Sequence, residues 1–420
     1  MTHRLILATL ISAASLQAAD WPQYRGPQGD GSTAEKIAAW PATGPKVLWK
    51  VESPNGFSSF AVAGGKAFTI EGREVDGVKQ EVLVTRDAAT GKEAWTAPIG
   101  IAKYDGGGDS GTKENKGGDG PRSTPTIVGK SVVTMSGGLV LQSFDIATGK
   151  EQWKVDLIKE HAGRNIQWQN AASPLLEGGL LYVGGGGPGE SLLAIDAATG
   201  KVVAKAFDEK ITHATPTAAT ILGKRQIVFF LQSGLLAVEP KTLTELWRYN
   251  FQYRTSTAAS PVVAGDIVYC SAGYGVGAGA AKITNTGGKF EAKEIYRVPG
   301  NKDIANHWST PVLYKGDLYG MFQFKEYGAG PVKAVDVATG AVKWQREGFG
   351  PGQVILAGDK VLALSDAGDL VLFEATPTDY KETARAHVLD GKCWTTPILA
   401  NGKIYARSTK EAVCIDAGGK

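Results

Sequence analysis

The stretch DIATGKEQW at residues 145–153 recurs with small changes along this chain. Its other copies are DAATGKEAW at 87–95, DAATGKVVA at 196–204, EPKTLTELW at 239–247 and DVATGAVKW at 336–344. The Asp and Thr side chains of such a turn bond turn amides, and the Gly adopts the positive φ that a following bulge needs. The Trp that follows belongs to an outer strand and is large enough to wedge against a neighbouring sheet. We therefore expect structural docking roles for Trp49, Trp95, Trp153, Trp247 and Trp344, with Ala204 marking a weaker joint.

A second phrase marks the start of each repeat: Ser or Thr, then Pro, an apolar stretch and a Gly. Its prolines are Pro125, Pro174, Pro216, Pro261, Pro311 and Pro397, and proline-free equivalents lie near Phe60 and Val354. Successive starts are 42 to 65 residues apart, which is the spacing of β-propeller blades. Eight starts predict an all-β, eight-bladed β-propeller with four-stranded antiparallel blades.

The last repeat contains a third strand and its turn but no fourth strand before Lys420. Residues 46–51 have the outer-strand pattern and precede any inner strand. We expect this N-terminal strand to complete the last blade and close the ring, which removes exposed sheet edges. The predicted organisation is a signal peptide at 1–19, an irregular N-terminal extension at 20–44 and a single propeller domain at 45–420.

The N-terminal residues have the features of a secretory signal peptide. His3 and Arg4 precede an apolar run from Leu5 to Leu16, and small residues follow, so we expect cleavage after Ala18 or Ala19. No cysteine near this point offers a lipid attachment site, and no internal run of 18 apolar residues would span a membrane. The sequence predicts an exported, periplasmic or secreted monomer without a membrane span or lipid anchor.

The net charge argues against a nucleic-acid-binding protein, and the cysteine positions argue against a disulfide. A formal net charge of +3 is too near neutral to indicate nucleic-acid binding. The three cysteines are Cys270, Cys393 and Cys414. We place Cys393 and Cys414 in the first and third strands of one blade, about 9–10 Å apart, which is too far for a disulfide. All three are expected to be small buried apolar side chains.

Long and varied connections predict the functional face. They include residues 71–80, 101–120, 157–171, 184–190, 272–280, 299–308 and 325–330. We expect all of them on the side where the inner strands begin, whereas the other turns are tight and repetitive. Varied loops on a rigid scaffold are where binding normally resides.

One position per repeat, three residues before the proline, is expected to surround the mouth of the central channel. It holds Phe57, Arg122, Ala171, His213, Ala258, Trp308, Pro351 and Trp394. The candidate ligand residues at this mouth are Arg122, Trp168, Gln169, Asn170, His213, Arg254, His307, Trp308 and Trp394. Such a group would bind a planar or anionic small molecule or a sugar. The alternative is that these side chains plug the channel by stacking on one another.

No catalytic or metal site is predicted. His161, His213 and His307 lie in loops of the same face, but their spacing matches no metal motif. Acidic residues in the Gly-rich insert 101–120 lack the ligand periodicity of a calcium loop. No nucleophile motif and no phosphate-binding loop can be found.

The D-x-x-T-G-K turns with their following Trp resemble the PQQ-like (pyrroloquinoline quinone repeat) β-propeller family over about the whole predicted mature chain. The opening WPQYRGP at 21–27, followed by GDG at 29–31, resembles the start of exported members. The resemblance implies one of two activities. One branch holds quinoprotein dehydrogenases, which bind PQQ and calcium at the channel mouth, and the other holds non-catalytic scaffolds such as the outer-membrane barrel-assembly lipoprotein.

The differences from the family favour the scaffold branch. Quinoprotein alcohol dehydrogenases hold PQQ between a Trp and a ring of adjacent cysteines, and no two cysteines are adjacent here. Their calcium ligands and catalytic Asp need carboxylates at the mouth, and the aligned position offers none. The leading hypothesis is thus a non-enzymatic propeller without a cofactor that binds an envelope protein or small ligand. A PQQ-dependent dehydrogenase with calcium and a carbohydrate-binding propeller that uses Trp168, Trp308 and Trp394 are the alternatives.

Overall fold

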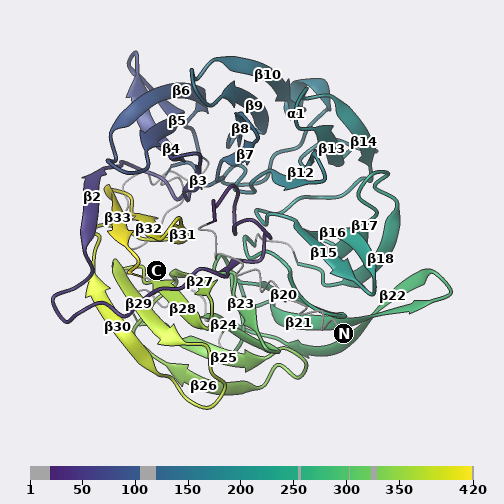
Figure 1. Cartoon of the computed structure of the whole chain (residues 1–420). Helices are drawn as coiled ribbons and strands as arrows, with labels where there is room; N and C mark the ends of the chain where they lie inside the picture. Colours follow the sequence, from purple (N-terminus) through teal and green to yellow (C-terminus); the bar gives the residue numbers. More distant parts are fainter. Residues whose placement is uncertain (1–18, 105–119, 254–256, 302, 323–328, 419–420) are drawn as a thin grey trace, which may run out of the picture.

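The computed structural model describes residues 19–104, 120–253, 257–301, 303–322 and 329–418. Eight sheets stand around a central axis as the blades of one ring (Figure 1). Within each blade the sequential strands pair antiparallel, from the inner strand at the channel to the outer strand at the rim. The predicted eight-bladed β-propeller is confirmed.

The strands of the first four blades follow the repeat. Blade 1 is β3 (Ala61–Ala63), β4 (Lys66–Val75), β5 (Val78–Asp87) and β6 (Glu93–Ile101), and blade 2 is β7 (Thr126–Val128), β8 (Ser131–Met135), β9 (Val140–Asp145) and β10 (Glu151–Asp156). Blade 3 is β11 (Leu175–Glu177), β12 (Leu180–Gly184), β13 (Leu192–Asp196) and β14 (Val202–Ala206), and blade 4 is β15 (Thr217–Ile221), β16 (Lys224–Leu231), β17 (Gly234–Val238) and β18 (Glu245–Asn250). One short helix, α1 (Leu157–Glu160), follows blade 2.

The other four blades complete the ring. Blade 5 is β19 (Val262–Ala264), β20 (Ile267–Ala272), β21 (Gly277–Thr286) and β22 (Lys289–Val298), and blade 6 is β23 (Val312–Tyr314), β24 (Asp317–Met321), β25 (Val332–Asp336) and β26 (Val342–Arg346). Blade 7 is β27 (Gln353–Ala357), β28 (Lys360–Leu364), β29 (Asp369–Glu374) and β30 (Glu382–His387), with a short fifth strand, β1 (Ser32–Thr33), parallel to β27. Blade 8 is β31 (Ile398–Ala400), β32 (Lys403–Arg407) and β33 (Glu411–Asp416), with β2 (Val47–Glu52) as its outer strand.

The ring closes as the sequence predicts. Strand β2 pairs antiparallel with β33, with Val47 opposite Ile415 and Glu52 opposite Glu411. The observed strand is displaced by one residue from the predicted 46–51. Figure 1 shows β2 at the rim beside the C-terminal strands, so the two ends of the domain share one sheet.

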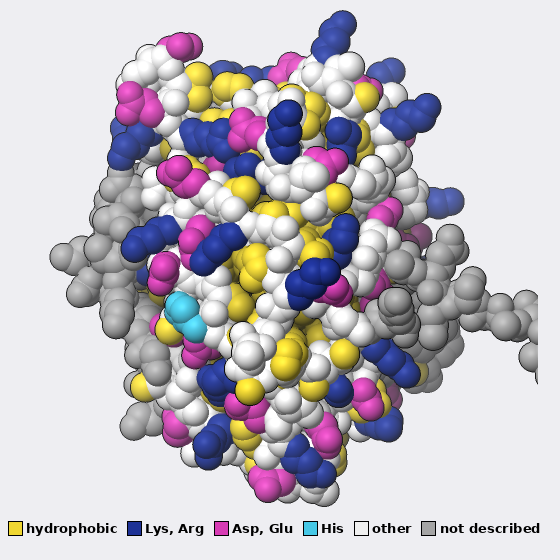
Figure 2. All heavy atoms as spheres, turned by 60° about the vertical axis from the view of Figure 1, so that its left-hand side comes forward, with side chains coloured by type: hydrophobic (Ala, Val, Ile, Leu, Met, Phe, Trp, Pro, Cys, Tyr) yellow, Lys and Arg dark blue, Asp and Glu magenta, His cyan; other side chains and the backbone are white. Residues whose placement is uncertain are grey.

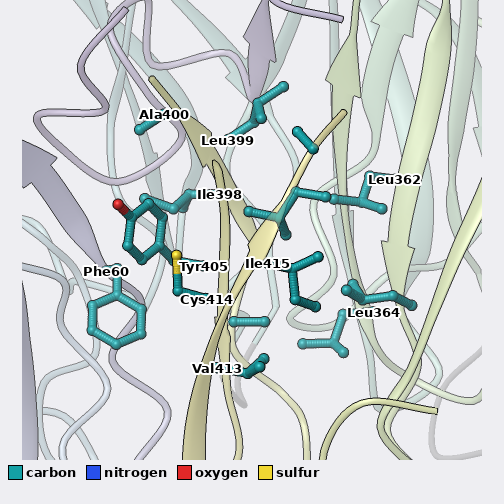
Figure 3. Close-up of a cluster of buried hydrophobic side chains, with 14 of the residues drawn as sticks. Phe60, Leu362, Leu364, Ile398, Leu399, Ala400, Tyr405, Val413, Cys414 and Ile415 are labelled. Atoms are coloured by element: carbon teal, nitrogen blue, oxygen red, sulfur yellow. The ribbon is translucent and has the colours of Figure 1, made fainter. Parts of the chain in front are cut away.

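Apolar side chains fill the space between adjacent blades because each inner sheet is covered on both faces. Figure 3 shows one such layer, where Phe60 of blade 1 and Leu364 of blade 7 approach the strands of blade 8. Cys414 lies in this layer, and all three cysteines are free and buried. Cys393 precedes β31 instead of lying in the inner strand, so its predicted strand position was wrong.

The outer surface carries no single-sign charged area on the side shown in Figure 2, where Lys and Arg alternate with Asp and Glu. This mixture agrees with the small formal net charge of +3. No helix among the described residues is long and apolar enough to cross a membrane.

The turn of the repeat has the hydrogen bonds that its sequence predicts. The Asp145 Oδ1 atom accepts the backbone N–H groups of Ala147 and Thr148 at 3.1 and 2.9 Å, and the Thr148 hydroxyl at 2.8 Å. Gly149 has φ +72°, and a Cβ atom there would lie 2.7 Å from the ring of Trp95. The glycine is needed both for its backbone conformation and for the indole that covers it.

Three of the expected docking tryptophans bond the backbone of the following blade. The indole N–H of Trp49 donates to the Ala88 carbonyl at 3.1 Å and that of Trp95 to Ile146 at 3.0 Å. Trp344 donates to the Thr376 carbonyl at 2.8 Å. The other two differ: the Trp153 ring covers Gly200 without such a bond, and Trp247 donates to Gln226 of its own blade at 2.7 Å.

The joints without Trp use other side chains. Between blades 3 and 4, Ala204 faces a turn in which Leu243 replaces the glycine, and the buried Leu243 packs in the same cluster as Ala204. Between blades 5 and 6, Tyr296 donates to the Val337 carbonyl at 3.1 Å and lies over Gly340. Sequence analysis missed Tyr296 because its repeat lacks the D-x-x-T-G-K turn.

The Ser and Thr residues before the prolines link adjacent inner strands. The N–H of Thr124 donates to the Ser173 hydroxyl at 2.9 Å, and the N–H of Ser173 donates to the Thr215 hydroxyl at 2.9 Å. The N–H of Ser59 reaches Thr124 at 3.2 Å, and that of Ser260 reaches Thr310 at 3.0 Å. The hydroxyls of Thr124, Ser173, Thr215 and Thr310 therefore each satisfy a buried amide of the neighbouring blade, which explains the Ser or Thr before these prolines.

Replacement of Thr124 by Val should destabilise the ring by about 1–3 kcal/mol, because the buried N–H of Ser59 loses its acceptor. Urea unfolding of the purified variants measures this loss. Thr124→Ser keeps the hydroxyl and should lie close to wild type. Equal stability of the Val and Ser variants would contradict the role assigned to the hydroxyl.

The N-terminal segment lies across the central channel, as Figure 1 shows for the purple start of the described chain. Trp21 forms a bridge with Val62 of β3, and the buried Arg25 donates to the carbonyls of Thr310 and Pro311 at 3.1 and 2.9 Å. Gln23 accepts the N–H of Leu176 at 3.0 Å. Farther along, Ser32 and Thr33 pair with the last two residues of β27, and Glu35 bonds the turn that follows β31. The segment therefore closes the channel at the end opposite the mouth.

Two of the predicted loops are largely strand. Residues 71–80 form the tip of the long β4–β5 hairpin, with Val75 opposite Val78, and 277–280 belong to β21. Residues 157–171 begin with α1. The extra strand length is possible because cross-strand pairing satisfies the backbone of a projecting hairpin without a blade on either side. The predicted insert 101–120 lies mostly outside the described residues.

Candidate functional site

The aligned residues lie where the repeat predicts, directly before the inner strands. Phe57 precedes β3, Arg122 precedes β7, Trp308 precedes β23 and Trp394 precedes β31. The remaining members of this position are Ala171, His213, Ala258 and Pro351. Since the inner strands of all blades run in the same direction, these residues surround one end of the channel. We call this end the mouth.

Aromatic rings from four blades contact one another along one side of the mouth. The ring of Phe57 lies 5.1 Å from that of Trp394, and Trp394 lies 4.7 Å from Trp308, centre to centre. His307 continues the row at 4.8 Å from Trp308, and Tyr274 follows at 5.0 Å from His307. These separations are those of direct ring contact. The row thus forms a continuous aromatic surface that links blades 1, 8, 6 and 5.

Polar contacts hold this row in place. The indole N–H of Trp308 donates to the Pro351 carbonyl at 2.9 Å, and Gln353 donates to the Trp308 carbonyl at 2.8 Å. The Lys392 ammonium lies 4.4 Å from the centre of the Trp394 ring and 5.9 Å from that of Phe57. Trp394 is buried, whereas Phe57 and Trp308 are partly exposed. The stacking that the plug interpretation requires is therefore present, and ring surface still faces solvent.

A second cluster surrounds Arg122 on the opposite part of the mouth. Its guanidinium donates to the Trp168 carbonyl at 2.7 Å and lies 5.1 Å from the ring centre of Tyr104. Tyr104 donates to Glu81, whose second oxygen accepts the N–H of Gly137 at 2.8 Å. Burial raises the pKa of Glu81, and the Tyr104 and Gly137 bonds and the Arg122 charge oppose it only in part. The cluster joins blades 1, 2 and 3 beneath the mouth.

His213 extends this cluster to blade 4. Its Nε2 atom lies 2.9 Å from the Gln169 carbonyl, and its ring centre lies 6.4 Å from that of Trp168. Burial, together with the positive charge of Arg122, lowers the pKa of His213 to about 4. The imidazole is therefore neutral near pH 7, so its Nε2–H donates to the carbonyl.

The lowered pKa of His213 makes the protein sensitive to acid. In the unfolded chain this histidine takes up a proton as the pH falls below its ordinary pKa of 6.5. In the folded chain it stays neutral down to about pH 4. Stability is therefore complete above pH 6.5 and should fall by about 2 kcal/mol by pH 5 from this residue. Urea unfolding at pH 7 and pH 5 measures the loss. His213→Gln keeps a donor but does not titrate, so a similar acid loss in that variant would contradict this assignment.

The loop before blade 3 has a strained backbone. Trp168 and Gln169 are consecutive residues with φ +65°, a conformation that costs non-glycine residues about 1 kcal/mol or more each. The Gln169 amide accepts a hydrogen bond from Asn165 at 2.5 Å. Asn170 is buried and bonds the backbone of Ala172 through both ends of its amide, at 3.0 and 3.1 Å. The Asn170 amide therefore holds the loop that presents Trp168.

Not all predicted site residues join these clusters. Arg254 lies outside the described residues. His161 bonds Glu190 at 3.0 Å beside helix α1, whereas His213 and His307 belong to the two different mouth clusters. Among the described residues, no three His, Cys, Asp or Glu side chains are grouped so as to hold a metal ion.

Four mouth residues were missed by sequence analysis: Glu81, Tyr104, Tyr274 and Lys392. Glu81 lies in the apolar strand β5, and an acid in such a run was a signal that could have been used. Lys392 lies two residues before Trp394 and could have been found from the aligned position. Tyr104 and Tyr274 lie in connections that do not repeat, so no alignment places them.

One comparison with known proteins identifies the family of this chain. The sequence profile described as "Outer membrane protein assembly factor BamB" matches residues 33–209 and 78–308, which together cover more than half of the 420 residues. A comparison with curated proteins finds no relative with significant sequence similarity.

Solved structures share the fold at low sequence identity. BamB from Moraxella catarrhalis is 13% identical with a TM-score of 0.59, over 88% of this chain and 99% of that one. The quinohemoprotein alcohol dehydrogenase from Comamonas testosteroni is 14% identical with a TM-score of 0.64, over 97% of this chain and 82% of that one. The alcohol dehydrogenase ADHIIG from Pseudomonas putida HK5 is 12% identical with a TM-score of 0.65, over 96% and 81%. At such identity these structures show the fold alone.

Proposed function

Because this chain belongs to the PQQ-like β-propeller family whose profile is described as outer membrane protein assembly factor BamB, we propose that it is an exported binding protein and scaffold. Its mouth face binds a partner in the cell envelope, in the periplasm or outside the cell. The observation that carries this proposal is the mouth itself, where an aromatic row and an Arg122 cluster converge from seven blades. The binding work requires no catalytic group.

The character of the mouth supports binding by surface contact. Tyr274 is 39% exposed, and Phe57, Trp308, Trp168 and Arg122 are each partly exposed. Aromatic side chains with Arg are the residues that dominate the energy of protein interfaces. The strained backbone of Trp168 and Gln169 also supports a binding role, since such strain is found mostly at functional sites. These features together favour a protein partner.

The aromatic pairs of the mouth leave no room for a quinone between their rings. A planar ring system held between two flat groups needs about 7 Å between them, twice the contact distance of stacked rings. The rings of Trp394 and Trp308 already contact each other at 4.7 Å, and those of Phe57 and Trp394 at 5.1 Å. The cysteines are free and buried, so they form no disulfide ring on which a quinone would stack. We therefore derive no redox step for this mouth.

Binding through the mouth is tested by photo-crosslinking in the envelope of cells that express the protein. A crosslinking amino acid in place of Tyr274 should capture a defined partner, and Trp308→Ala in the same chain should reduce the yield at least tenfold. Val203, which is 55% exposed on the outer strand β14, offers a control. A crosslinking yield from Val203 equal to that from Tyr274 would contradict binding through the mouth. A yield from Tyr274 that Trp308→Ala does not change would contradict it as well.

A further inference from the structure

The backbone of Ala19 is held by a carboxylate. The N–H of Ala19 donates to Glu35 Oε1 at 3.0 Å, and the carbonyl of Ala19 accepts the N–H of Asn401 at 3.2 Å. The same Glu35 carboxylate accepts the N–H groups of Asn401 and Gly402 at 3.1 and 2.7 Å. Next to them, the Asp20 carboxylate accepts the Asn401 side-chain amide at 2.9 Å. The β31–β32 turn of blade 8 thus holds the start of the described chain.

An ammonium group in place of the Ala19 peptide N–H would strengthen its contact with Glu35. Glu35 already accepts two backbone N–H groups from the turn, and the N–H of Ala19 is a third neutral donor. In the described part of the chain its hydrogen-bond partners include no cation. An ammonium group on Ala19 would supply the positive charge and two more N–H donors. Hydrogen bonds between charged groups are roughly twice as strong as those between neutral groups.

We propose that Ala19 is the mature N-terminus and that its ammonium group binds the Glu35 carboxylate. This inference rests on the export proposed above. The sequence leaves cleavage after Ala18 or after Ala19 open, and the contacts distinguish the two. Cleavage after Ala19 would remove the residue whose N–H and carbonyl bond Glu35 and Asn401. Cleavage after Ala18 keeps both bonds and adds the charge.

The covalent step is a hydrolysis by the peptidase class that removes signal peptides. Water adds to the carbonyl carbon of Ala18, and the C–N bond between Ala18 and Ala19 breaks. The hydroxyl of the water stays on the new Ala18 carboxyl group. The Ala19 nitrogen gains the other hydrogen of the water and then binds a proton from solvent, since an α-amino group has an ordinary pKa of about 7.7–8.0.

Cleavage between Ala18 and Ala19 would fix the N-terminal segment that closes the channel. After Glu35, Ala38 donates to the Ala417 carbonyl at 2.9 Å, and Ile37 is buried in the cluster of blades 7 and 8. Before it, Trp21 forms a bridge with β3 of blade 1. The ammonium–carboxylate contact therefore joins the two ends of the N-terminal segment at blade 8, next to the strand that closes the ring.

The cleavage site is tested by intact-mass measurement and N-terminal sequencing of the protein recovered from the periplasm or medium. The expected first residue is Ala19. A first residue of Asp20 or later, or of Ala18 or earlier, would overturn this inference while the export proposal stands. A chain that stays uncleaved inside the cell would overturn both.

The charge contact is tested by thermal unfolding of two forms that begin at Ala19 and at Ala18, each with and without E35Q. In the form that begins at Ala19, E35Q should lower Tm by roughly 1–2 °C. In the form that begins at Ala18 the ammonium is displaced by one residue, so E35Q should cost less than half of that. The exposed Glu347 gives a matched control, because E347Q removes a carboxylate distant in sequence from this site. An equal effect of E35Q in both forms, or equal effects of E35Q and E347Q, would overturn the ammonium contact.

Discussion

A chain that lacks residues 20–52 is expected not to fold, because it loses the outer strand of blade 8. Strand β2 pairs along its length with β33, and its Trp49 bonds Ala88 and lies over Gly91 of blade 1. Without β2, one edge of β33 loses its partner and the joint between blades 8 and 1 loses its indole. A propeller is stable only when every blade has both neighbours, so the expected result is loss of the cooperative transition and not a modest shift.

Circular dichroism during heating and size-exclusion chromatography measure this outcome. A shorter deletion of residues 20–40 is the matched control, since it removes the channel segment but leaves β2 in place. That control should fold with reduced stability. Addition of a synthetic peptide with residues 44–53 should restore folding of the longer deletion. A cooperative melt of the longer deletion at the wild-type temperature would contradict closure by β2.

Arg407→Ala is expected to lower the free energy of unfolding by about 3–5 kcal/mol. The Arg407 side chain is fully buried in β32 and reaches across to blade 1. One terminal nitrogen donates to Ile70 and Thr69 at 2.8 and 3.1 Å, and the other to the carbonyls of Pro54 and Asn55 at 3.1 and 3.2 Å. The substitution leaves these acceptors buried without their donor.

The charge of Arg407 is also needed by Glu71. This glutamate is fully buried and bonds Ser53, Arg73 and Arg86. Burial by itself would raise the pKa of Glu71, but the positive charges of Arg407 and Arg73 outweigh it and hold the pKa below its ordinary value. Removal of Arg407 therefore weakens the ion network between blades 8 and 1.

Chemical denaturation of the variants measures the effect. Arg164 provides a matched control, because it is 57% exposed and pairs with Asp208 at 3.4 Å on the surface. Arg164→Ala should cost no more than about 0.5 kcal/mol. Arg407→Lys keeps a charge but loses the fork of donors, so it should fall between the two. A cost for Arg407→Ala that equals that of Arg164→Ala would contradict the role of this residue.

The architecture follows from local patterns, and these can be read without coordinates. The turn at 145–150 places its Asp, Thr and Gly by hydrogen bonds within six residues, so its repetition reveals the number of blades. The segment around Trp49 has the same outer-strand pattern, which is why the closing strand was predicted within one residue. The register of the repeat also placed Phe57, Trp308 and Trp394 at one end of the inner strands.

The contacts between distant segments needed the tertiary structure. Arg25 bonds Thr310, 285 residues away, and Arg407 bonds Ile70 at a separation of 337. Arg25 precedes the first blade, and Arg407 lies in blade 8 but in neither repeated phrase, so nothing in the sequence around them indicates a partner. Tyr104 and Tyr274 reach the mouth from connections whose lengths differ between blades, and chain entropy leaves such segments without a preferred path until the blades pack.

The repeated sequence thus determined the number of blades, their order and the strand that joins the ends, because each depends on bonds between near neighbours. Which side chains contact one another inside the channel depends on the tertiary structure. These side chains come from segments without a repeated pattern, and the packing of the blades sets where those segments lie. The N-terminal segment shows the difference most clearly. It was predicted to be irregular, and its tertiary contacts hold it across the channel from blade 1 to blade 8.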